Sequence, residues 1–204
     1  MMIFYRERLA VIAIPKTGTT ALENALGPSA SAIFRNPPHI KHVGMHGFNA
    51  KYRKLFEPNN LAPIETMAIM REPVEWLGSW YRYRQRPALN GKPNSTADYS
   101  FDQFVEAYLK EDQPPFAKVG DQAGFVTDKK GELMVNHLFS YADLPVAVRF
   151  LERKLKREIS LKRVNQSPKK QISLSPDLEA QLRETYELDF GIYQVLQDGP
   201  LSTG

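Results

Sequence analysis

Short apolar runs alternate with longer amphipathic stretches along most of the chain, and this alternation sets the expected architecture. The apolar runs predict strands at Leu9–Ile14, Ala32–Phe34, Thr66–Met70, Leu133–Phe139 and Ile159–Val164. Apolar residues at helical spacing predict helices at Thr19–Leu26, Pro73–Arg84, Phe101–Glu111, Pro145–Arg157 and Pro176–Tyr186. Alternating strands and helices favour an α/β fold in which helices flank a central parallel sheet.

Turn-forming residues and one capping pattern complete this picture. Ser100 is followed three residues later by Gln103, which is the pattern of a capping box at a helix start. Residues 86–99 and 112–124 are rich in turn formers and lack apolar periodicity, so we expect mobile loops there. Long loops on a rigid sheet serve either in substrate recognition or as plain surface connections.

Composition limits the class of protein. A chain of 204 residues with 42% hydrophobic content can bury one full core, so we expect a single domain over residues 1–204. The absence of cysteine removes disulfides, thiolate zinc sites and cysteine nucleophiles. The sequence begins without a signal-peptide pattern and has no apolar run of membrane-spanning length. We therefore expect a cytoplasmic protein with no membrane partner.

The net charge of +4 suits an anionic ligand, but it does not choose among an anionic cofactor, an acidic acceptor and nucleic acid. The densest basic stretch, residues 149–157, carries apolar residues at 148, 151 and 155. That spacing favours a helix with a solvated charged face, so we do not expect nucleic acid as a partner.

Residues 15–20, Pro-Lys-Thr-Gly-Thr-Thr, join an apolar strand to the start of a helix. Gly18 lets the backbone approach an anion closely, and the neighbouring amides lie at a helix N-terminus whose dipole favours negative charge. Further donors come from the Lys16 ammonium and the hydroxyls of Thr17, Thr19 and Thr20. This pattern predicts a phosphate-binding loop.

The order of residues in the loop argues against an ordinary ATP or GTP site. A Walker A loop places lysine directly after its second glycine, whereas Lys16 precedes Gly18 and no glycine lies five residues before Gly18. No predicted apolar strand ends in an aspartate of the Walker B type. A P-loop kinase that acts on a small molecule or nucleotide is disfavoured on these grounds, and it stays open as an alternative.

A second strand-to-helix unit contains a candidate partner for an anion. An apolar strand ends before Arg71, and Pro73 suits the first helical turn because proline lacks the N–H that would have no partner there. Ser79 falls on this helix, eight residues after Arg71. A guanidinium can bind two phosphate oxygens with its planar fork, and a helical serine supplies another donor.

Together these two units resemble those of the sulfotransferase superfamily, which uses 3′-phosphoadenosine 5′-phosphosulfate (PAPS). The loop is similar to the one that holds the 5′ end of PAPS, and Arg71 with Ser79 is similar to the pair that binds its 3′-phosphate. Residues 164–190 resemble, more loosely, the end of bacterial members. The resemblance implies a P-loop nucleoside-triphosphate-hydrolase-like three-layer fold, with PAPS bound by Lys16, Thr17, Gly18, Thr19, Thr20, Arg71 and Ser79.

The resemblance also implies the chemistry. The sulfuryl group of PAPS would move by in-line displacement, without a metal, to a hydroxyl or amine of an unidentified acceptor, a carbohydrate or another small molecule. Lys16 would stabilise the leaving phosphate. In relatives, basic residues of the tail reach the 3′-phosphate, which points to Lys169 and Lys170, with a solvated pair as the alternative.

The family's catalytic base is a histidine or glutamate between the two phosphate units, often just after a lysine, and Lys41-His42 fits that description. A histidine with a pKa near neutrality can accept a proton at physiological pH. His39 as the base and a purely structural His42 remain alternatives, whereas His137 in a predicted strand is interpreted as structural.

Two further alternatives stay open. His39, His42 and His46 lie close in sequence and suggest a metal site, but the two prolines before them, Gly44 and the lack of an acidic neighbour disfavour it. A non-catalytic module that keeps the nucleotide fold in order to bind a glycan or a partner would bind the cofactor without turnover.

Overall fold

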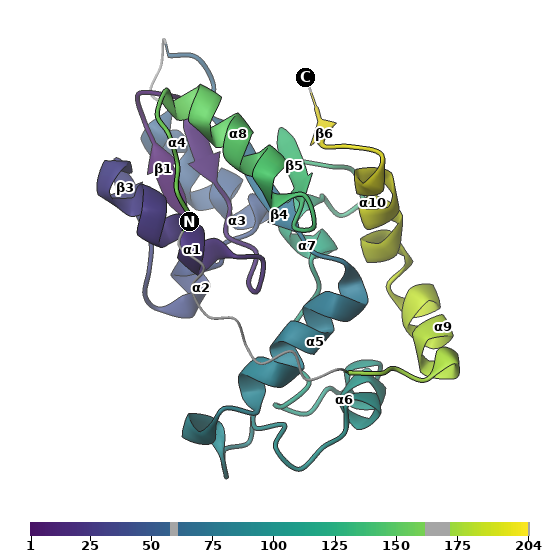
Figure 1. The fold of residues 1–204 in the computed structure, drawn as a ribbon. Helices are drawn as coiled ribbons and strands as arrows, with labels where there is room; N and C mark the ends of the chain where they lie inside the picture. Colours follow the sequence, from purple (N-terminus) through teal and green to yellow (C-terminus); the bar gives the residue numbers. More distant parts are fainter. Residues whose placement is uncertain (58–60, 162–171, 204) are drawn as a thin grey trace.

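The computed structural model describes residues 1–57, 61–161 and 172–203, which form a mixed α/β structure around an open six-stranded sheet (Figure 1). The strands lie in the order β3-β1-β2-β4-β5-β6. Their bounds are β1 Met2–Phe4, β2 Leu9–Val11, β3 Ala32–Ile33, β4 Glu65–Met70, β5 His137–Ser140 and β6 Leu201–Ser202.

The strands β2, β4 and β5 pair in parallel, whereas β1 and β6 run in the opposite direction. Val11 of β2 pairs with Met67 of β4, and Met67 pairs with His137 of β5, in parallel register. The β1 strand is antiparallel to both β2 and β3, and β6 is antiparallel to β5. The expectation of a parallel sheet is therefore wrong for β1 and β6. A tight turn through Arg8 (φ 52°) folds β2 back beside β1, which makes this pair antiparallel.

The helices connect and cover these strands. In chain order they are α1 Thr19–Leu26, α2 Pro38–Lys41, α3 Met45–Gly47, α4 Arg53–Phe56, α5 Pro73–Arg84, α6 Phe101–Tyr108, α7 Ala123–Val126, α8 Leu144–Leu155, α9 Pro176–Thr185 and α10 Glu187–Gln197. Single turns of other helix types are η1 Gly27–Ser29, η2 Phe48–Tyr52 and η3 Pro87–Leu89. Within the described ranges, every helix is too short or too polar to cross a membrane.

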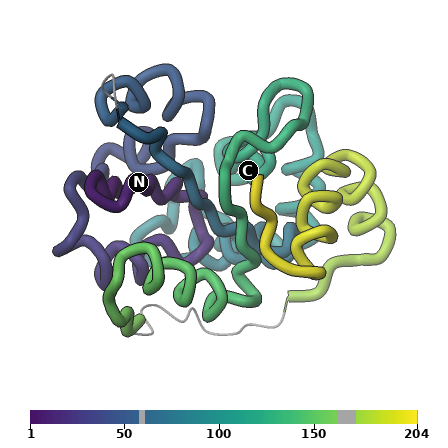
Figure 2. Tube along the Cα trace, turned by 90° about the horizontal axis from the view of Figure 1, so that it is seen from above, coloured from purple at the N-terminus to yellow at the C-terminus, as the bar shows by residue number. Residues whose placement is uncertain are grey.

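Helices cover both faces of the sheet because alternate strand residues point to opposite sides. One face carries Ala10, Ala68 and Leu138, which pack with α3, η2, α7 and α10. The other carries Met67 and Phe139, which pack with α1 and α8. Figure 2 shows the two layers: α8 lies on one side of the strands and the segment around residue 50 lies on the opposite side.

A third apolar cluster lies beyond the end of β4, where α5 extends away from the sheet (Figure 1). Trp76 and Tyr81 of α5 pack with Phe104 of α6 and Leu182 of α9. The predicted capping box at the start of α6 is confirmed, with both the Ser100 and the Gln103 side-chain hydrogen bonds present. This cluster holds the outer part of α5 against the C-terminal helices.

The predicted bounds of α1 and α5 are confirmed, and other predictions need correction. The expected strand at Ile159 is wrong for residues 159–161, because the Ile159 amide donates to the Glu152 side chain (3.0 Å) and its apolar side chain fills the α8 face of the core. Residues 162–164 lie outside the described part of the chain. The expected loop at 86–99 contains the short helix η3. It is also attached to α5, because the buried Thr96 hydroxyl donates a hydrogen bond to the Tyr81 carbonyl (2.8 Å).

Candidate functional site

The loop after β2 turns sharply before α1 begins at Thr19. Lys16 and Gly18 both have positive φ angles, 66° and 79°, and the buried Thr17 hydroxyl donates to the carbonyl of Ile14 (2.8 Å). Thr19 is half-buried and Thr20 is exposed on the first turn of the helix. The first amides of a helix have no carbonyl partner within it, so this turn presents donors at the carboxyl end of the central strands.

Tyr141 connects this loop to the end of β4. A Cβ atom added to Gly18 would lie 3.0 Å from Cε2 of Tyr141, so only glycine fits there without a shift of the ring. The guanidinium of Arg71 lies over the same ring, 4.9 Å from its centroid. The two predicted anion-binding units therefore meet on one aromatic side chain, which follows β5.

Arg71 is held at both its backbone and its side chain. The fully buried Gln122 accepts a hydrogen bond from the Arg71 amide (2.9 Å) and donates to the Arg71 carbonyl (2.8 Å). The Arg71 side chain pairs with Glu75 at 2.8 Å, one helical turn later. Gln122 thus replaces a neighbouring strand as the partner of the backbone at this position.

A buried carboxylate supports Gln122 in turn. Asp189 of α10 is 5% exposed and accepts hydrogen bonds from the amides of Gln122 (2.9 Å) and Ala123 (3.4 Å) at the start of α7. Burial raises the pKa of Asp189 from 3.8 to about 7, against the opposing effect of these two hydrogen bonds. Hydrogen bonds between Asp189 and Gln122 and between Gln122 and Arg71 therefore link α10 to the backbone of Arg71.

Lys16 lies against the outer half of α5. Its ammonium is 4.0 Å from the ring centroid of Tyr83 and 5.6 Å from that of Trp80, close enough for cation–π attraction. Burial, followed by the positive charges of Arg86, Arg71 and Arg82, lowers the pKa of Lys16 from 10.5 to about 8. Lys16 is thus surrounded by cations and aromatic rings.

The loop is also fixed to α5 by a direct hydrogen bond. Nε1 of the buried Trp76 donates to the carbonyl of Pro15 (2.8 Å), the residue just before Lys16. Ser79 is half-buried on α5, three residues after Trp76 and directly before Trp80. Nε1 of Trp80 is buried and has no hydrogen-bond partner among the described residues, and such an atom is unusual in a folded protein.

His42 follows α2 and lies beside the strand that leads to the loop. Its Nδ1 is 2.7 Å from the carbonyl oxygen of Ala13, so Nδ1 must carry the proton and Nε2 keeps its lone pair in the neutral ring. Burial lowers the pKa of His42 below 6.5, and the charge of Lys41 acts in the same direction. His42 is therefore a neutral proton acceptor at pH 7.

The remaining predicted residues have varied positions. His39 and His46 are exposed on α2 and α3, and no group of three or more His, Asp or Glu side chains in the described ranges is arranged to hold a metal. His137 bonds to Glu65 (2.8 Å) at the amino ends of β5 and β4, the opposite end of these strands from the loop. Lys169 and Lys170 lie outside the described residues.

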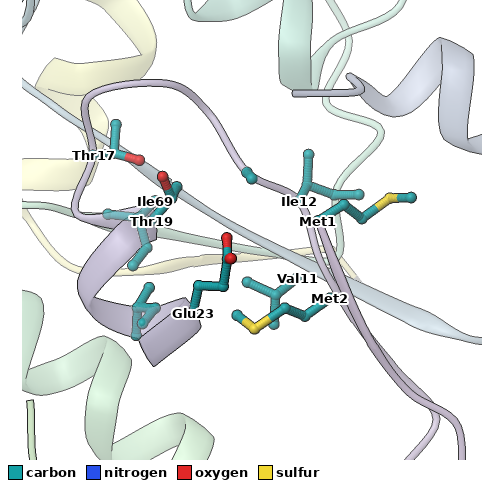
Figure 3. A pocket seen from close by; sticks show the side chains of 10 residues that line it. Met1, Met2, Val11, Ile12, Thr17, Thr19, Glu23 and Ile69 are labelled. Atoms are coloured by element: carbon teal, nitrogen blue, oxygen red, sulfur yellow. The ribbon is translucent and has the colours of Figure 1, made fainter. Parts of the chain in front are cut away.

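A small, largely apolar pocket lies behind the loop, between α1 and the sheet, and Figure 3 shows the Glu23 side chain reaching into it. It is lined by Met1, Met2, Val11, Ile12, Ala13, Thr17, Thr19, Leu22, Glu23 and Ile69. Burial opposes ionisation of Glu23, but hydrogen bonds from Lys41 and Arg35 outweigh it and lower its pKa. Glu23 is thus paired with two cations, and the pocket shares Thr17 and Thr19 with the loop.

Comparisons with models of protein families, with curated proteins and with solved structures find no match to this chain.

Several residues of this site were not found by sequence reasoning. Tyr141, Gln122 and Asp189 come from segments far from both predicted units, and only the fold brings them there. Arg82 and Arg86 follow Ser79 on or just after α5, and their spacing of three and seven residues from it could have indicated a cationic stripe along one face.

Proposed function

We propose that this chain is a PAPS-dependent sulfotransferase with a P-loop nucleoside-triphosphate-hydrolase-like three-layer arrangement. The observation that carries the proposal is the meeting of two cationic strand-to-helix units at the carboxyl end of β2 and β4. Lys16 comes from one unit and Arg71 from the other, and Tyr141 contacts both units, at Gly18 and at Arg71. Ligands of open α/β sheets bind outside the carboxyl ends of the strands.

The residues present fit an anionic nucleotide of this kind. Lys16 and Arg82 have no salt-bridge partner in the described part of the chain, and burial, followed by nearby positive charge, lowers the pKa of Lys16. A bound anion would offset the repulsion between these positive charges, which favours anion binding at this cluster. The buried indole N–H of Trp80, which has no hydrogen-bond partner among the described residues, is consistent with a ligand cradle.

In this proposal each residue has a defined task. PAPS would supply an activated sulfuryl group. Lys16, with a pKa of about 8, is mostly protonated at neutral pH and places a cation where negative charge would develop. His42 has its Nδ1 proton fixed on the Ala13 carbonyl, which leaves Nε2 to remove a proton from an acceptor hydroxyl or amine. Arg71 and Ser79 would hold the 3′-phosphate.

The test is calorimetric titration, without added metal, of 3′-phosphoadenosine 5′-phosphate and of ADP, which lacks the 3′-phosphate. We expect selective binding of the first ligand and a loss of about tenfold or more in Arg71→Ala, since a charge-assisted phosphate contact is worth roughly 1.5–3 kcal/mol. Arg149→Ala is the matched control, because Arg149 is exposed on α8 and forms no salt bridge in the described ranges.

Other outcomes would favour the alternatives. Equal binding of ADP, or binding of ADP that requires Mg²⁺, would favour a P-loop kinase. Selective binding of 3′-phosphoadenosine 5′-phosphate without turnover of PAPS on any acceptor would favour a non-catalytic module.

A further inference from the structure

A cation pair at the outer end of the site is not explained by the nucleotide contacts proposed above. The guanidinium of Arg86 lies 4.4 Å from the ring centroid of Tyr83, and the ammonium of Lys16 lies 4.0 Å from the same centroid. Arg86 is exposed, so its donors face solvent, while Tyr83 is half-buried and fixes the position of both cations. Two cations held on one ring create a local excess of positive charge.

No carboxylate of the described residues pairs with either of these two cations. Neither Lys16 nor Arg86 takes part in a salt bridge among the described residues. The sequences of residues 58–60 and 162–171 contain no Asp or Glu. By contrast, Arg71 already pairs with Glu75. An uncompensated pair of this kind attracts an anion from solution, and the effect is screened by salt.

The cations are distributed along α5 in two groups. Arg71 lies two residues before α5 begins at Pro73, and Arg86 lies two residues after α5 ends at Arg84, so a helix of about 18 Å separates them. Arg82 belongs to the inner group, because burial and then the charge of Arg71 lower its pKa. Lys16 contacts Trp80 and Tyr83 in the last turns of α5, so Arg86, just past that end, lies beyond Lys16 from Arg71 at the start of the helix.

We propose that Arg86, held on Tyr83, forms an anion subsite on the acceptor side of Lys16, and that the acceptor carries a carboxylate or sulfate group near the hydroxyl or amine that it presents. This inference rests on the proposed function, since it takes Lys16 as the point of transfer. A guanidinium stacked on an aromatic ring keeps its edge donors available for a planar or tetrahedral oxyanion.

The test uses inorganic sulfate as the probe, titrated into protein saturated with 3′-phosphoadenosine 5′-phosphate at constant ionic strength. We expect one sulfate to bind to the saturated wild-type protein and its affinity to fall at least fivefold in Arg86→Gln. Arg86→Lys should retain part of the affinity because it keeps the charge, and Arg149→Gln, at an exposed position on α8, should leave it unchanged. Affinity for the nucleotide should change less than twofold in all three variants, and thermal melting confirms that each is folded.

Three results would overturn the inference. The first is the absence of sulfate binding to the saturated wild-type protein, and the second is equal sulfate affinity in wild type and Arg86→Gln. The third is a large loss of nucleotide affinity in Arg86→Gln, because that result would assign Arg86 to the cofactor. If the nucleotide does not bind at all, the proposed function fails on its own. Sulfate titration of the free protein then still shows whether Arg86 holds an anion.

Discussion

The pH dependence of nucleotide binding gives a direct test of the role assigned to Lys16. Burial and neighbouring cations lower its pKa to about 8, so the protonated fraction falls from about nine tenths at pH 7 to about one tenth at pH 9. A bound phosphate favours the ammonium and raises this pKa, so binding takes up a proton. Affinity should therefore fall as pH rises through 8, by up to about tenfold between pH 7 and pH 9.

The assay is calorimetry of 3′-phosphoadenosine 5′-phosphate at pH 7 and pH 9 in buffers of different ionisation enthalpy, which yields the number of protons taken up. The ligand's phosphates are already deprotonated over most of this range, since their second pKa lies near 6. We expect an uptake of about 0.1 proton at pH 7 and approaching 0.9 at pH 9.

The matched variant is Lys16→Arg, which keeps a positive charge that does not titrate in this range. It should bind the nucleotide with little pH dependence and without proton uptake at pH 9. If the wild-type affinity is the same at both pH values, or if Lys16→Arg keeps the wild-type slope, Lys16 does not contact the bound anion and the reasoning is refuted.

Three further predictions concern stability, measured as the free energy of unfolding in urea. Gly18→Ala should cost at least about 1 kcal/mol more than Gly91→Ala, because both positions have positive φ but only Gly18 has a ring atom 3.0 Å from the new methyl group; equal costs would contradict this. Gln122→Ala should cost about 1–3 kcal/mol, since it leaves the Arg71 backbone amide and carbonyl without their partner, and an unchanged unfolding midpoint would exclude that clamp. Asp189 holds a proton in the folded state between about pH 4 and pH 7 that the unfolded chain has released, so its contribution to stability falls as pH rises over that range. The free energy of unfolding of Asp189→Asn should therefore increase relative to that of the wild type as pH rises. A difference in unfolding free energy that does not change with pH would contradict the raised pKa of Asp189.

Local signals were enough to place the two helices that carry the proposed anion contacts. Gly18 has the positive φ that ends the loop, and Pro73 occupies the first turn of α5, so the observed bounds of α1 and α5 equal those expected. The strand before each helix was also found, although β2 ends at Val11, earlier than expected. Residues that begin or end a helix act on the neighbouring few residues, so their effect can be predicted without knowing the fold.

The elements that were missed depend on contacts far away in sequence. The strands β1 and β6 have three and two residues, too few to show periodicity, and they form only by pairing with β2 and β5. In the same way, Gln122 is an unremarkable residue in a predicted loop until the fold places it beside Arg71. Such positions are set by tertiary packing, which overrides local propensity.

The attachment of the loop to α5 makes the site observable without a label. The chain has two tryptophans, and both lie on this helix: Trp76 donates to the Pro15 carbonyl, and the Trp80 ring lies 5.6 Å from the Lys16 ammonium. Their rings are 6.2 Å apart and nearly perpendicular. All the intrinsic tryptophan fluorescence of this protein therefore originates beside the loop, so that an anion that reaches Lys16 changes the emission of the whole molecule.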